Sequence, residues 1–191
     1  GLFATCLFCS IYYYTIKQEN EVYQTSLKQF DNEVNSLIEL NSQNDISNIV
    51  DMVYWDDFVD YIKTKDSKWF NANIPTSLDT YKADYLGIYD ANGKFINKSS
   101  NANIVSVDFI PKEVFTNINT KKILQFYIKI PEGYVLICGA SIHPSIDIYK
   151  RVTPSAGYFF IAKLLNKAYF SELETINSSK IDFQKGAGIE N

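Results

Sequence analysis

The stretch Lys122–Ile142, KILQFYIKIPEGYVLICGASI, decides the fold of this chain. Its first half, which ends at Ile130, is rich in β-branched and aromatic residues and predicts a strand. Pro131–Gly133 combines proline with glycine, which is typical of a tight turn. The second half begins at Tyr134 and has the same composition, so we expect it to pair back antiparallel on the first.

A second hairpin is expected upstream. Asp84–Tyr89, DYLGIY, indicates a short strand, and Asn92–Gly93 is a strong turn signal. Lys94–Asn97 then returns as the second strand of that hairpin. Between the two hairpins, Pro111–Ile118 predicts a short helix in an otherwise irregular crossover.

Downstream of the central hairpin we expect a helix and then a last strand. Thr153 is a good N-cap and Pro154 suits the first helical position. Apolar residues follow near helical spacing at Tyr158, Ile161, Leu165 and Ala168. This helix should run to about Ile176, and Lys180–Gln184 should form the strand.

Two helices are expected before the first hairpin. Ile16–Leu40 contains no proline or glycine, and its apolar residues recur near helical period. A second helix should cover Ile46–Thr64, capped by Asp45 or Ser47, followed by a loop over Trp69–Pro75. The elements together predict an α+β fold: a PAS-like antiparallel sheet with helices packed on one side.

The N-terminal segment points to a membrane. Gly1–Ile16 carries no charge, and Lys17 opens a strongly polar stretch. A span needs about 20 apolar residues, so we expect residues 1–16 to be the outer end of a transmembrane helix. The tyrosines at 12–14 suit the membrane interface. A signal-peptide core is the rival interpretation, but it lacks a small-residue cleavage site.

The expected domain order follows from this segment. Residues 17–43 should form a long membrane-proximal helix leading out of the membrane, and residues 44–191 should form the PAS-like domain. The expected location is the cell membrane, with the domain in the periplasm or extracellular space.

Composition excludes several function classes. The 18 basic and 22 acidic residues are interspersed, and no basic stripe suggests a nucleic-acid partner. Cys6 and Cys9 sit in the apolar run and Cys138 lies alone, so neither a disulfide scaffold nor a metal or cofactor site is expected. A hydrolase would need His143 beside a serine and a carboxylate, and the spacing alone does not supply that. We therefore expect no catalytic residue.

A distinctive motif lies in Asp51–Tyr61, DMVYWDDFVDY, and is followed by Asn73–Ile74 and by Ala83–Gly93, which ends in an Asp-x-x-Gly turn. These segments resemble the signature of the CHASE4 family of extracytoplasmic sensor domains. Gly139–Pro144 and the helix expected from Gly157 are weaker matches in the right order. Within these matches the chain departs from the family pattern. Met52 stands where the family often has Trp, and Val59 where it often has Tyr. A basic residue of the family's last helix is matched by Lys163 alone.

The resemblance implies a signal-sensing, ligand-binding domain of a transmembrane receptor in a two-component or related system. A ligand-induced change would pass through the N-terminal helix to a cytoplasmic output domain such as a histidine kinase or diguanylate cyclase. The implied partners are a small-molecule ligand and a second copy of the chain. The alternative is a ligand-free docking or dimerisation module that binds a periplasmic protein.

The expected ligand-binding residues are Trp55, Asp56, Tyr61, Asn73, Tyr127 and His143. Trp55 and Asp56 point about 100° apart on a helix, so they can present a π-face and a charge to one molecule. Asn73 could hydrogen-bond beside Asp56. In the alternative interpretation this motif only fastens helix to sheet, Tyr127 packs in the core, and His143 is an ordinary residue at a strand end.

The dimer expectation is testable on the membrane-proximal helix. Replacing Leu27 and Val34 with Glu should weaken dimerisation, because both lie on the apolar stripe expected to pair between copies. Analytical ultracentrifugation at matched concentration measures the effect. Sedimentation that does not change would count against this interface.

Overall fold

The computed structural model of the chain describes residues 17, 43–147 and 152–176. The segment 1–16, the helix expected before residue 41 and the strand expected over 180–184 lie outside these residues, apart from Lys17. Among the helices that are described, none combines the length and the apolar character needed to cross a bilayer.

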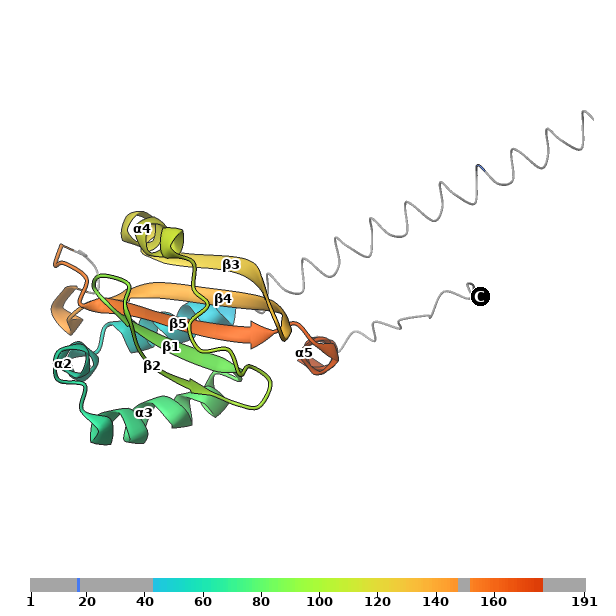
Figure 1. Cartoon of the computed structure of the whole chain (residues 1–191), viewed down its shortest axis with the longest axis horizontal. Helices are drawn as coiled ribbons and strands as arrows, with labels where there is room; N and C mark the ends of the chain where they lie inside the picture. The colour runs from blue at the N-terminus through green and yellow to red at the C-terminus, as the bar shows by residue number, and fades with distance from the viewer. Residues whose placement is uncertain (1–16, 18–42, 148–151, 177–191) are drawn as a thin grey trace, which may run out of the picture. The chain divides into compact units, whose positions relative to one another are not determined.

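A five-stranded antiparallel sheet, with strand order β2-β1-β5-β4-β3, lies at the centre (Figure 1). The strands are β1 Tyr85–Asp90, β2 Phe95–Ser100, β3 Ile123–Ile130, β4 Gly133–Ile142 and β5 Gly157–Leu164. The helices are residues 43–53, α2 Asp56–Thr64, α3 Ser67–Thr80, α4 Lys112–Lys121 and α5 Lys167–Ile176, with a 3-10 turn at Ser145–Asp147. The expected α+β, PAS-like architecture is confirmed.

Both predicted hairpins are confirmed, and so is the short helix between them, which is α4. Asp90 shapes the first turn, because its Oδ1 accepts hydrogen bonds from the backbone N–H of Asn92 and of Lys94, each at 2.9 Å. Gly93 follows with a φ of 73°, a conformation that glycine adopts without steric cost.

The helix expected after Thr153 is wrong: Gly157–Leu164 is the central strand β5. All eight of its residues are buried, and its sequence, GYFFIAKL, is apolar except for Lys163. In such a run helical and strand periods cannot be told apart. Lys163, expected on a helix, therefore lies on a strand. Pairing with β1 and β4 on its two sides decides the conformation.

The loop expected over Trp69–Pro75 is also wrong, because these residues belong to α3. Asp66 caps this helix by accepting a hydrogen bond from the N–H of Lys68 at 2.9 Å. Phe70, Ile74 and Leu78 recur every four residues and are buried. A proline inside a helix removes one backbone hydrogen bond, a cost that the burial of this face offsets. The single helix expected over Ile46–Thr64 is interrupted at residues 54–55.

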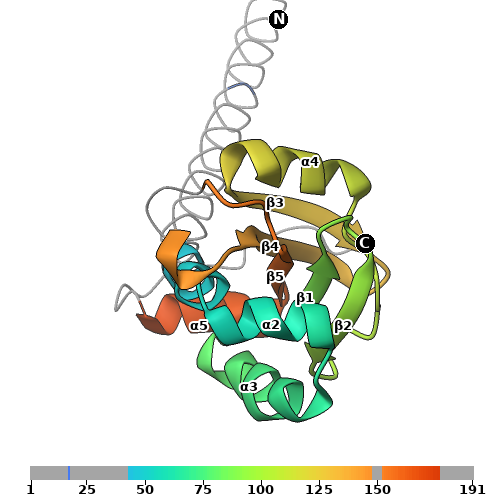
Figure 2. The same cartoon turned by 90° about the vertical axis from the view of Figure 1, so that its left-hand side faces the viewer.

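Helices cover both faces of the sheet (Figure 2). The expectation from the sequence, helices on one side only, is wrong. Residues 43–53, α2 and α3 pack on one face, against a core that includes Leu86, Cys138 and Phe159. The helix α4 packs on the other face, against a core that includes Tyr89 and Phe160.

A buried ion pair joins β5 to the first of these helices. Lys163 Nζ lies 2.6 Å from Asp45 Oδ1, with side-chain exposures of 7% and 3%. Burial raises the pKa of Asp45, and the charge and hydrogen bond of Lys163 act against that rise. The pair fixes the position of residues 43–53 on the sheet, because separating the two side chains would leave a buried charge without a partner, which costs several kcal/mol.

We expect Lys163→Met to lower the free energy of unfolding by about 3–5 kcal/mol, because it leaves the Asp45 carboxylate buried and unpaired. Adding Asp45→Leu should recover most of that loss. Lys63→Met is the control: its pair with Asp60 is 3.6 Å long and largely exposed, so a change of about 1 kcal/mol or less is expected. Urea denaturation measures all three, and equal effects of Lys163→Met and Lys63→Met would contradict the assignment.

Candidate functional site

A buried carboxylate organises the loop between β4 and β5. Asp147 is 1% exposed, and its Oδ1 accepts a hydrogen bond from the N–H of Val152 at 2.6 Å. Its Oδ2 accepts two more from Thr153, one from the backbone N–H and one from the side-chain hydroxyl. Burial acts to raise the pKa of Asp147, but these hydrogen bonds and the neighbouring His143 outweigh it, so the pKa lies below its usual range.

His143 is held between this carboxylate and a serine. Its Nδ1 lies 3.2 Å from Asp147 Oδ2 and 3.2 Å from Thr153 Oγ1, and its Nε2 lies 2.8 Å from Ser141 Oγ. The carboxylate favours a proton on Nδ1, which leaves Nε2 of the neutral ring to accept from the Ser141 hydroxyl. The ring also stacks on Tyr54, with centroids 6.0 Å apart. The imidazole therefore has one fixed orientation.

These side chains line a pocket of about 420 Å³. Its wall carries the hydroxyls of Ser141, Thr153, Ser155 and Tyr158, the amide of Asn119, the imidazole of His143 and the ammonium of Lys122. Among the residues that the structure describes, the lining contains no carboxylate, since Asp147 lies behind His143 and Thr153. The four hydroxyls donate within the protein, to His143, Asp147, the Gly157 carbonyl and Asn119, so their oxygens are left to accept. Acceptor oxygens beside the cationic Lys122 suit a small polar or anionic molecule that carries hydroxyl groups.

The same loop is bonded to two helices on the other side of the sheet. The N–H of His143 donates to the carbonyl of Val53, at the end of helical residues 43–53, over 2.8 Å. Asp56, the first residue of α2, accepts from the N–H of Ser145 at 2.9 Å and from its hydroxyl at 2.6 Å. The side-chain and backbone hydrogen bonds of Ser145 lower the pKa of Asp56. A change in the pocket therefore has a direct path to both helices.

Three of the predicted site residues gather around Trp69. The rings of Trp55 and Tyr61 lie 5.3 and 5.0 Å from its ring. Asn73 donates to the Trp69 carbonyl over 2.8 Å within α3. The Trp69 indole N–H is buried without an acceptor in the described residues. Asn73 was expected to hydrogen-bond beside Asp56. In the structure Asp56 accepts its hydrogen bonds from Ser145 instead.

Tyr127 lies away from the other predicted site residues. It lies on β3, is 54% exposed and pairs with Leu136, six residues before the end of β4 at Ile142. Six strand residues span about 20 Å, which separates Tyr127 from His143 by most of the length of the sheet.

Sequence reasoning missed Asp147, Thr153 and Lys122. The spacing of Ser141 and His143 was a usable signal, because alternate residues of a strand share one face. Thr153 was interpreted as a helix cap, and nothing in the local pattern marks Asp147 as buried. The requirement set for a hydrolase, His143 beside a serine and a carboxylate, is met in space, but Ser141 is only 4% exposed. Residues 43–147 and 152–176 contain no group of three metal-ligating side chains.

We expect Asp147→Asn to lower the thermal midpoint at neutral pH, because an amide cannot replace a carboxylate that accepts three hydrogen bonds. The lowered pKa of Asp147 makes its contribution present above the unfolded value of about 4, and lost as the pH falls through the folded value. The difference in thermal midpoint between the wild type and Asp147→Asn should therefore become smaller as the pH falls. Exposed Asp57→Asn is the control. A gap that stays constant from pH 7 to pH 3 in thermal scans would refute this role.

The family comparison agrees with this architecture. The model of the family described as CHASE4 domain matches residues 37–184. No curated protein matches the chain. Because the family match covers more than half of the sequence, the chain belongs to the CHASE4 family of extracellular sensor domains.

Proposed function

We propose that this domain binds a small polar molecule outside the cytoplasm and reports its presence to the rest of a membrane-anchored receptor. Membership of a sensor-domain family supports a sensing role. The observation that carries the finer proposal is the polar pocket of about 420 Å³, whose loop is hydrogen-bonded to the end of helical residues 43–53.

The ligand chemistry follows from the wall of the pocket. Lys122 brings a positive charge to the described part of the lining, and the hydroxyl oxygens around it can accept hydrogen bonds. A carboxylate with one or more hydroxyl groups matches this wall: its charge would pair with Lys122 in a charge-assisted hydrogen bond, and its hydroxyls would donate to the acceptor oxygens. Tyr158 and Asn119 also belong to this wall, and the Tyr158 hydroxyl donates to Asn119 Oδ1 over 2.8 Å.

Transmission requires that the ligand favour one arrangement of the loop over another, since equal affinity for both shifts nothing. Contact with His143 or Thr153 alters the network around Asp147, and therefore the bonds from His143 to Val53 and from Ser145 to Asp56. Residues 43–53 would carry the change toward the N-terminal helix, and we propose that this helix pairs with a second copy of the chain.

A docking module without a ligand remains the second candidate. Tyr127 and Tyr134 are 54% and 59% exposed near the β3–β4 turn, and exposed aromatic side chains are typical of contact surfaces between proteins. The two functions differ in whether a small molecule alone stabilises the domain.

The pocket is tested by thermal-shift and calorimetric screening of the whole chain with small carboxylates, sugar acids, neutral sugars and amines. We expect a hydroxy-carboxylate to bind, and Lys122→Asn to weaken it at least about tenfold through loss of a charged hydrogen bond. Lys122 has a φ of 70° and a ψ of −43°, so the thermal midpoint of unliganded Lys122→Asn is compared with that of the wild type to separate loss of binding from loss of stability. Lys65→Asn is the matched control, because Lys65 also ends a helix, with a φ of 55°, outside this pocket.

Hydrogen exchange then tests transmission. The bound ligand should change protection of the amides in residues 43–53, and Asp56→Asn should reduce the effect on α2 by weakening the contact with Ser145. If no compound of any class shifts the midpoint, the sensing proposal fails and the docking function moves ahead.

A further inference from the structure

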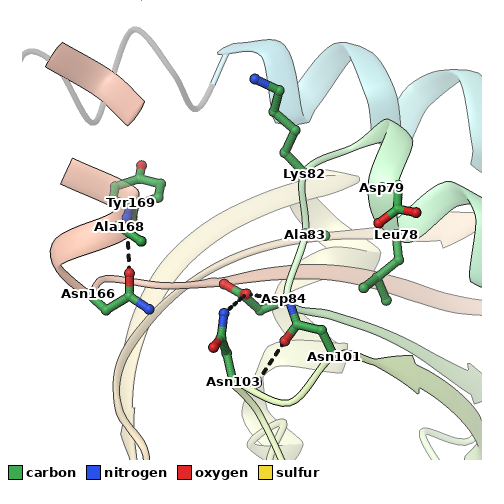
Figure 3. A pocket seen from close by; sticks show the side chains of 10 residues that line it. All are labelled: Leu78, Asp79, Lys82, Ala83, Asp84, Asn101, Asn103, Asn166, Ala168 and Tyr169. Atoms are coloured by element: carbon green, nitrogen blue, oxygen red, sulfur yellow. Dashed lines mark hydrogen bonds between the residues drawn. The ribbon is translucent and has the colours of Figure 1, made fainter. Parts of the chain in front are cut away.

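A second pocket, of about 330 Å³, lies at the opposite end of β5 (Figure 3). Leu78, Ala83 and Tyr169 form an apolar floor, with exposures of 8%, 4% and 8%. The rim is polar and comes from the end of α3, the start of β1, the loop after β2 and the start of α5. Such a combination of an apolar floor and a few fixed polar groups is typical of small-molecule sites.

Asp84 is the fixed polar group at the centre of that rim. Its Oδ1 accepts hydrogen bonds from the side-chain amides of Asn101 and Asn103, each at 2.7 Å, and its Oδ2 accepts from the N–H of Leu164 at 2.7 Å. The carboxylate is therefore held in one position, and binding a cation beside it requires little reorganisation.

The charge of the lining favours a cation. Asp79 and Asp84 contribute two carboxylates and Lys82 one ammonium. Figure 3 shows the Lys82 side chain running from the backbone away from Asp84. The rim amides are already engaged: Asn103 donates to Asp84, and the Asn166 oxygen points to the N–H of Tyr169, as Figure 3 shows. The acceptors left for a cation are therefore the two carboxylates.

We propose that this second pocket binds a small organic ammonium compound. Its amine would lie against the carboxylates of Asp84 and Asp79, and its hydrocarbon part on Leu78, Ala83 and Tyr169. The first pocket, by contrast, carries Lys122, and the ligand proposed for it has the opposite charge. The proposal does not depend on the first pocket being a sensor site.

The position of this pocket gives it a consequence for the helix α5. Asn166 Oδ1 accepts from the N–H of Tyr169 at 3.0 Å and so caps α5, while the Asn166 side chain also lines the pocket. An occupant that engages Asn166 or Tyr169 changes the start of α5. The pocket residue Asp84 also accepts from the N–H of Leu164, and Leu164 directly follows Lys163 of the buried ion pair.

Isothermal titration of the whole chain with benzylammonium chloride tests the proposal, with benzoate and benzyl alcohol as probes of the same shape. We expect saturable binding of the ammonium compound, at least tenfold tighter than either control probe. Ala168→Trp should abolish it, because this exposed α5 residue lines the pocket and a bulky side chain there fills it. Asp84→Asn should weaken it at least tenfold.

The controls separate this site from general effects. Glu113→Gln removes one negative charge from an exposed position on α4 and should leave binding unchanged. Lys122→Asn should also leave it unchanged, which distinguishes this pocket from the first. Should Asp84→Asn fail to fold, Ala168→Trp decides alone. Equal binding of the three probes, no saturable binding, or full binding by Ala168→Trp would overturn the proposal.

Discussion

The strand β5 is paired on both edges and buried on both faces, and the rest of the domain is arranged around it. Its backbone hydrogen bonds to β1 and β4 join two hairpins into one sheet. Its side chains alternate between the core under α2 and α3 and the core under α4. Lys163 adds an ionic contact to residues 43–53. A strand in this position cannot move without disturbing every layer.

The two pockets lie at the two ends of β5 and differ in charge. Near its start, a buried carboxylate fixes His143 behind a wall of hydroxyls and one lysine. Near its end, Asp84 is itself part of the lining. In each case the carboxylate accepts a hydrogen bond from a backbone N–H, which sets its orientation. The strand β5 thus lies between two pockets whose described linings differ in charge, each next to a different helix.

The hairpins were predictable because their signals are local. Alternation, β-branched residues and a turn with Asn92 or Pro131 specify a hairpin without reference to the rest of the chain. The segment after Thr153 was not, because a run of apolar residues fits a buried helix or a buried strand equally well. Pro75 was misleading in the same way: it signals a break, yet the burial of Phe70 and Leu78 keeps the helix intact.

The sequence by itself determined the α+β class, the two hairpins and the resemblance to the CHASE4 family, since each depends on residues close together in the chain. It also singled out His143 and Asp56 as polar residues beside hydrophobic ones. Only the tertiary structure decided which groups meet: Asp56 with Ser145, and Lys163 with Asp45. These partners are separated by 89 and 118 residues, and a hydrogen bond over such a distance is fixed by packing, which no local pattern encodes.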